Sequence, residues 1–121
     1  MVVVDSSGWI EFFTDGPKAR AFAVYLKDPR RIATPAVVLY EVYKKIKRER
    51  GESLARRCLA QLEKTQVIAM TRDVAVLAAD LSLEHSLLMA DAIVLATARI
   101  EDADLITGDT DFEKIPGVRV L

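Results

Sequence analysis

The stretch MADAIVLATARIEDADLITGDTDF, residues 89–112, joins a helical pattern to a strand pattern and decides how the rest of the chain is interpreted. From Ala90 to Ile100, apolar residues recur at helical spacing. Leu105-Ile106-Thr107 then has the pattern of a short buried strand, which runs directly into an acidic segment. Parallel strands of α/β proteins place site residues at their carboxyl ends, so this stretch predicts both an α/β fold and a functional site.

Three acidic side chains of this stretch are candidates for that site. Asp91 stands at the start of the helix, where the helix dipole alone also favours a carboxylate. Asp109 and Asp111 directly follow the strand. A helix start explains Asp91 but not two further acids at the end of a strand, and we therefore interpret the three as a site for a hard cation.

Length and composition limit the classes of protein that the chain can belong to. It has 121 residues, 51% of them hydrophobic and 29% charged, which predicts one globular domain over residues 1–121. No apolar run approaches the ~20 residues that span a bilayer, and no signal-peptide pattern opens the chain, so we expect a cytoplasmic protein without a membrane partner. One histidine and one cysteine argue against structural zinc sites and histidine-based triads. The net charge of −1 means that any binding of nucleic acid has to be local.

Short apolar runs between helical segments predict the remaining strands. They are Val2–Val4, a weak run at 31–33, Gln66–Met70 and Val118–Leu121. Strands that alternate with helices are typical of βαβ units. The prediction is an α/β fold, an αβα sandwich around a mostly parallel sheet of four or five strands.

Two consecutive helical segments, 36–50 and 52–64, predict a helical hairpin that breaks at Gly51. Thr34-Pro35 predicts the start of the first helix, with a capping hydroxyl followed by proline at the first helical position. Glu41 lies beside the apolar face of this helix, partly turned inward, where a carboxylate needs a partner or a metal. Pairing with a lysine one turn later is the surface alternative.

Acids from distant segments are expected to meet at one rim of the sheet. Asp5 follows the first strand, and the ends of the first and fourth strands can lie side by side in a parallel sheet. Taken alone, Asp5 is equally well explained as the N-cap of the next helix. Converging carboxylates repel one another unless a cation binds, and oxygen-only ligands favour Mg²⁺ or Mn²⁺. Such a site supports in-line attack of metal-activated water on a phosphate, with a hydroxyl of Ser6, Ser7 or Thr107 orienting a water or a carboxylate.

Four motifs of the chain together resemble the PIN-domain family, and specifically the compact toxins of VapBC toxin–antitoxin pairs. The motifs VVVDSS, TPAVVLYEV, MADAIVLATA and LITGDTDF occur in the family's order and span nearly the full length. The resemblance implies a catalytic, metal-binding quartet with one acid from each motif: Asp5, Glu41, Asp91 and Asp109. It also implies that Ser6 supports Asp5 and that Thr107 and Asp111 assist Asp109. Asp111 is in addition a fifth candidate ligand of the metal. By the same resemblance we expect a Mg²⁺- or Mn²⁺-dependent endoribonuclease that is a homodimer, inhibited by a small antitoxin whose tail lies across the acidic groove.

Basic and aromatic residues beside Glu41 are candidates for contact with the RNA substrate. Lys44, Lys45 and Arg48 lie on the predicted hairpin, where they either bind RNA phosphates or form an ordinary solvated face. Tyr40 and Tyr43 either stack on a base or contact a dimer mate or the antitoxin.

Two other functional classes remain open on the sequence alone. A receiver-type signalling domain also has an acidic magnesium pocket, but it needs an acid pair after the first strand and a phospho-acceptor after the third. Here the first strand is followed by one acid, Asp5, and the third only loosely by Asp73. The second alternative is a PIN-like module that binds RNA or a protein partner without turnover.

Overall fold

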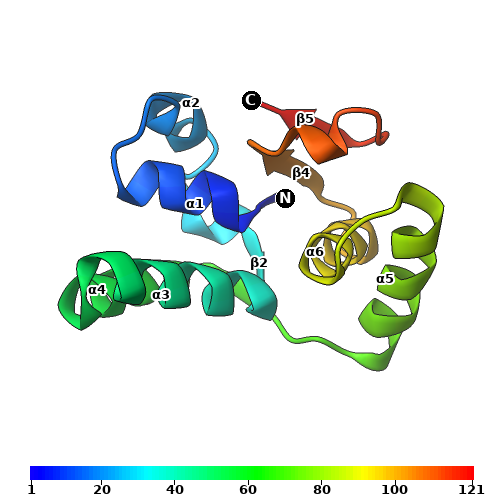
Figure 1. The fold of residues 1–121 in the computed structure, drawn as a ribbon, viewed down its shortest axis with the longest axis horizontal. Coiled ribbons are helices and arrows are strands. Elements are labelled where there is room, and N and C mark those ends of the chain that lie inside the picture. Colours follow the sequence, from blue (N-terminus) through cyan, green and yellow to red (C-terminus); the bar gives the residue numbers. More distant parts are fainter.

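Five strands form the centre of the structure, a computed structural model that describes residues 1–121 (Figure 1). Their bounds are β1 Val2–Val4, β2 Ala33–Pro35, β3 Gln66–Ile68, β4 Asp104–Thr107 and β5 Val118–Val120. All pairings are parallel, in a three-stranded sheet of order β1-β4-β5 and a two-stranded sheet β2-β3. A single bridge between Val2 and Ile32 joins the two sheets. The predicted α/β fold with a mostly parallel sheet is confirmed.

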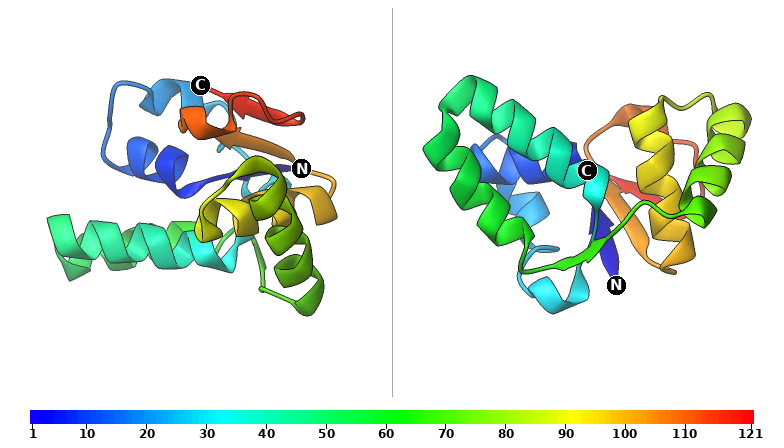
Figure 2. Two further views of the ribbon diagram at one scale, coloured as in Figure 1. Left: turned by 45° about the vertical axis from the view of Figure 1, so that its right-hand side comes forward. Right: turned by 90° about the horizontal axis from the view of Figure 1, so that it is seen from below.

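Helices surround these strands and extend as two pairs to either side (Figure 2). Their bounds are α1 Ser6–Phe13, α2 Ala19–Ala23, α3 Ala36–Arg50, α4 Glu52–Leu62, α5 Arg72–His85 and α6 Met89–Ile100. Two 3₁₀ turns complete the chain, η1 Pro29–Arg31 and η2 Thr110–Phe112. Helices α3 and α4 form the predicted hairpin on one side, and α5 packs against α6 on the other. No single helix is long and apolar enough to cross a membrane.

Helix α6 is the most deeply buried of the helices. Its residues Ala92–Ala98 are buried without interruption, because the strands cover one side and α5 the other. Val3 and Val4 of β1 and Leu105 of β4 are fully buried beside it. The stretch 89–112 therefore supplies both the central helix and a central strand, as its pattern predicts.

Helix α3 begins at Ala36 as predicted, but the predicted capping role of Thr34 is wrong. Thr34 and Pro35 belong to β2, which pairs with β3. In this pairing Thr34 lies opposite Val67 and Pro35 lies opposite Ile68. The Thr34 hydroxyl lies 2.6 Å from the buried Thr65 Oγ1 and makes no bond to the helix. The hydroxyl satisfies a buried partner on a neighbouring segment, because the extended backbone of the strand continues to Pro35, two residues further than the pattern indicates.

Candidate metal centre

The pairing of β1 with β4 brings Asp5 to the carboxyl end of the sheet beside Thr107. Val4 lies opposite Ile106 in the parallel register, and the Asp5 amide donates to the Ile106 carbonyl at 3.2 Å. The next side chains on the two strands, Asp5 and Thr107, therefore meet, and both are buried. The sequence prediction that the first and fourth strands end side by side is confirmed.

Three hydrogen-bond donors fix the Asp5 carboxylate at this corner. Asp5 Oδ1 accepts from Ser7 Oγ at 2.6 Å and from the Gly8 amide at 3.1 Å, so Asp5 caps α1. Asp5 Oδ2 accepts from Thr107 Oγ1. A carboxylate oxygen has two acceptor positions, so Oδ2 retains one for a further partner. Burial raises the pKa of Asp5, with a smaller contribution from the charge of Asp109, although these hydrogen bonds lower it.

The same two hydroxyls shape the segment that follows β4. Thr107 Oγ1 accepts from the Asp109 amide at 2.9 Å, and Ser7 Oγ accepts from the Gly108 amide at 3.0 Å. Asp109 Oδ1 in turn accepts from the Asp111 amide at 2.8 Å and caps η2. Each hydroxyl thus links Asp5 to the backbone that carries the next acids.

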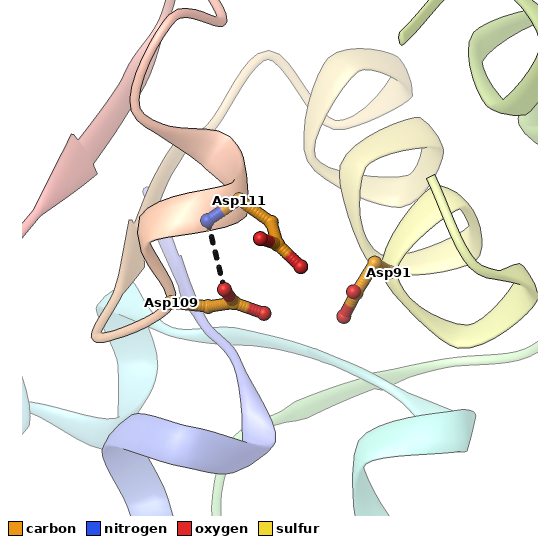
Figure 3. A group of neighbouring side chains, drawn as sticks. All are labelled: Asp91, Asp109 and Asp111. Carbon is orange, nitrogen blue, oxygen red and sulfur yellow. Dashed lines mark hydrogen bonds between the residues drawn. The ribbon is translucent and has the colours of Figure 1, made fainter. Parts of the chain in front are cut away.

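Asp91 faces this segment from α6. It is the third residue of the helix, and its carboxylate points toward Asp109 and Asp111 (Figure 3). One carboxylate oxygen from each of these three acids lies within 4.8 Å of the others. The pKa of Asp91 is raised to about 6, first by burial and then by the negative charges of the other acids, Asp109, Asp5, Glu41 and Asp111. No protein group donates a hydrogen bond to it, so the helix dipole is the only local feature of the fold that favours its charge.

Glu41 completes the group from α3. It is half-buried, and burial raises its pKa, with the charge of Asp5 adding to the effect. A hydrogen bond from Ser6 acts in the opposite direction. The hydroxyl that bonds Asp5 is that of Ser7. Ser6, the first residue of α1, acts on Glu41, and its predicted support of Asp5 stays a prediction. Ser7 is a candidate hydroxyl from the sequence but lies outside the predicted site, because its local pattern does not distinguish it from Ser6.

The donor set fits a hard divalent cation. The five candidate ligands offer only carboxylate oxygens, and none of them forms an ion pair with a lysine, arginine or histidine: Asp5, Glu41, Asp91, Asp109 and Asp111. Ligands on opposite sides of a Mg²⁺ ion lie about 4.2 Å apart, since each bond is ~2.1 Å long. The oxygens of Asp91, Asp109 and Asp111 all lie within 4.8 Å of one another, which is compatible with one shared ion of that size.

The predicted RNA-contacting residues continue along α3 from Glu41. Lys44 and Lys45 are exposed, one turn after Glu41, and Lys44 Nζ donates to Tyr40 Oη at 3.0 Å. Arg48 lies a further turn away, 3.7 Å from a carboxylate oxygen of Glu49. The structure thus places these cations beside the acids but pairs none of them with an acid of the site.

Comparison with known proteins identifies the fold. A family model described as "PIN domain" matches residues 2–118. The chain is similar to a chain in a toxin–antitoxin complex from Klebsiella pneumoniae, with 29% identity, a TM-score of 0.83, and coverage of 99% of this chain and 97% of the other. It shares its fold with VapC20 of Mycobacterium tuberculosis, a toxin described as cleaving the sarcin–ricin loop (19% identity, TM-score 0.80, 96% and 95% covered). It also shares its fold with a chain of VapBC2 from Rickettsia felis, crystallised with a DNA fragment from the promoter (17% identity, TM-score 0.76, 100% of this chain and 98% of the other covered). No curated protein gives a significant match.

Proposed function

Because this chain belongs to the PIN-domain family and has the fold of VapC-like toxins, we propose that it is a divalent-metal-dependent endoribonuclease and the toxin of a toxin–antitoxin pair. The observation that carries the proposal is the convergence of five carboxylates from four segments at one rim, without a cationic side chain among them. A receiver-type signalling domain has no support, since the family match covers nearly the whole chain.

In this proposal, Asp5, Glu41, Asp91 and Asp109 hold Mg²⁺ or Mn²⁺, with Asp111 as a further ligand. A bound ion there would activate a water as nucleophile and neutralise charge on the phosphoryl oxygens of RNA. The chain itself orients the acids. Ser7 and Thr107 hold both oxygens of Asp5, and the backbone amide of Asp111 holds one oxygen of Asp109.

We assign the approach of the RNA backbone to the exposed cations of α3. Lys44, Lys45 and Arg48 follow Glu41 on one side of the helix, at spacings of three, four and seven residues. A phosphate backbone that follows this row reaches the acids at the Glu41 end. Each such contact adds a salt-dependent increment to RNA affinity.

Protein partners are the second part of the proposal. Leu83, Leu88 and Met89 are 85, 76 and 77% exposed on the α5–α6 side, which supports a protein contact there. An antitoxin and a second copy of the chain are the two partners proposed, and one solved relative is described as a toxin–antitoxin complex. Residence in the cytoplasm stays a prediction.

The test is cleavage of RNA while Mg²⁺ or Mn²⁺ is titrated, with Asp91→Asn as the principal variant. Asp91 receives no hydrogen bond from the protein, so its replacement leaves the hydrogen bonds of the fold intact. We expect wild-type cleavage to require the metal and Asp91→Asn to reduce it by at least about a hundredfold. Asp80→Asn, an exposed acid of α5 outside the cluster, is the matched control and should keep full activity.

Metal-dependent cleavage that survives in Asp91→Asn would remove this residue from the mechanism. RNA binding without turnover at any metal concentration would contradict the nuclease and favour the non-catalytic binding module.

A further inference from the structure

The side chain of Tyr40 is the most exposed aromatic group of the chain. It is 61% exposed, and Phe12 is 37% exposed. An aromatic ring in water forgoes the stabilisation that its burial would give. The ring on the surface of α3 is therefore available to a partner outside the chain.

Tyr40 lies at the border of the proposed metal centre. It immediately precedes Glu41, whose pKa is raised by the charge of Asp5, so this turn of α3 borders the acidic rim. Lys44, one turn further on, donates from Nζ to Tyr40 Oη. An aromatic ring thus neighbours both a proposed ligand of the metal and a cation suited to a phosphate.

One cation contacts the Tyr40 ring. Lys44 Nζ donates to Oη at 3.0 Å and lies over the ring, 5.1 Å from its centre. The side chain of Tyr40 is nevertheless 61% exposed, so ring surface remains available to a ligand. Lys44 and its neighbour Lys45 form no ion pair with a carboxylate. The hydrogen bond thus positions the ring and leaves the lysine charge uncompensated.

Tyr43, the other tyrosine of α3, is in the opposite situation. It is half-buried, with Lys47 Nζ 5.5 Å and Arg56 Cζ 5.7 Å from its ring centre. Both cations are also paired with Glu52, at 3.5 and 3.6 Å. Tyr43 is therefore part of the contact between α3 and α4, and it is not available to a ligand.

We propose that Tyr40 stacks on an unpaired base of the RNA substrate, next to the phosphate that reaches the acids, while Lys44 contacts the adjoining phosphate. The inference rests on the proposed nuclease function and assigns the side chain that contacts an unpaired base of its substrate. A base inside a duplex already stacks on its neighbours, whereas an unpaired base is free to stack on an aromatic side chain. A tyrosine stacks on any base, so this contact selects strandedness and not sequence.

The experiment measures RNA affinity by fluorescence anisotropy, in Mg²⁺, with Asp91→Asn present in every protein to prevent cleavage. The probes are a short unstructured RNA, a set in which each base in turn is replaced by an abasic ribose, and a duplex of the same sequence. We expect one abasic position to weaken binding by roughly 5- to 100-fold, the contribution of one stacked base. Tyr40→Leu should weaken binding of the intact RNA by the same factor and lose all sensitivity to that abasic position.

Two further variants separate stacking from other effects of the substitution. Tyr40→Phe keeps the ring and should restore sensitivity to the abasic position. Tyr43→Leu, the matched control, should retain that sensitivity. Tyr40→Leu should not alter binding of the duplex.

The proposal is overturned if Tyr40→Leu binds single-stranded RNA as tightly as its parent, or if it keeps the abasic sensitivity. A Tyr40→Leu defect confined to a protein partner would also overturn it and would assign the ring to that partner. Failure of the nuclease function is distinguishable, because a chain with Asp91 intact would then bind RNA through Tyr40 without cleaving it.

Discussion

Two carboxylates of the candidate metal centre, Asp5 and Asp91, occupy opposite environments. Asp5 is 5% exposed and accepts hydrogen bonds on both oxygens from Ser7, Gly8 and Thr107. Asp91 is half-buried and accepts none, and burial with four neighbouring acids raises its pKa to about 6. One acid is thus held by the fold, and the other is exposed to repulsion that the fold does not relieve.

The difference separates two requirements of a cation site. Hydrogen bonds around Asp5 set the geometry and connect the ends of β1 and β4, so they contribute to stability whether or not an ion is present. The repulsion at Asp91 disfavours the folded chain until a cation binds, because like charges are close in a partly desolvated place. Stability and function therefore depend on different carboxylates of the same site, and three variants test that division.

The largest expected effect on stability is at the Asp5 corner. Thr107→Val keeps the shape of a fully buried side chain but removes the donor to Asp5 and the acceptor of the Asp109 amide. Leaving these groups without a partner should lower the free energy of unfolding by about 2–3 kcal/mol, measured by urea denaturation.

Thr97→Val is the matched control for this loss. Thr97 is also buried, but its hydroxyl only adds a second bond to the Ile93 carbonyl, which the helix already uses. We expect a change of less than about 0.5 kcal/mol. Equal losses at both threonines would mean that the Asp5 network is no more important than any buried hydroxyl.

The acids of the site were predictable from the sequence because backbone periodicity places them. Asp5 and Asp109 follow strand patterns, Asp91 opens a helical pattern, and Glu41 lies at the edge of an apolar helix face. The confirmed parallel pairing of β1 with β4 then brings the strand ends together.

The hydroxyl partners were not predictable in the same way. Ser6 and Ser7 are neighbours with the same chemistry, and only the orientation of α1 against β4 and α3 decides that Ser7 meets Asp5 and Ser6 meets Glu41. The capping role predicted for Thr34 failed for a related reason, since a local capping motif carries no information about Thr65, 31 residues away. Local patterns indicate backbone conformation, whereas hydrogen-bond partners between segments depend on the assembled fold.

The two serines provide a test substitution, Ser7→Ala, and its matched control, Ser6→Ala. Ser7→Ala removes one bond to Asp5 Oδ1 and leaves the Gly108 amide without its acceptor, so it should cost about 1–2 kcal/mol in the free energy of unfolding. Ser6→Ala removes a bond to the half-buried Glu41, which water can replace, and should cost less than about 0.5 kcal/mol. A larger loss at Ser6 would reverse the assignment of the two hydroxyls.

The smallest effect has the opposite sign. Asp91→Asn removes a carboxylate whose pKa rises from 3.8 to about 6 on folding, so the ionised form disfavours the folded state. After solvent screening of this half-buried group, the metal-free variant should exceed the wild type by about 1 kcal/mol in the free energy of unfolding near pH 8. The folded wild type binds more protons than the unfolded chain between these two pKa values, so its stability falls as the pH rises through that window. Below about pH 4 the carboxyl is protonated in both states, and the difference between variant and wild type should vanish.

Added Mg²⁺ should reverse the order of the two proteins at the higher pH. The ion relieves the repulsion only where Asp91 is ionised, and saturating binding to the folded state alone stabilises it by about 1–3 kcal/mol. Thermal unfolding with and without the metal measures this, with Asp80→Asn as the exposed-acid control that should follow the wild type in both conditions. If Asp91→Asn were less stable than the wild type without metal, Asp91 would be a structural residue like Asp5, and the division between the two carboxylates would fail.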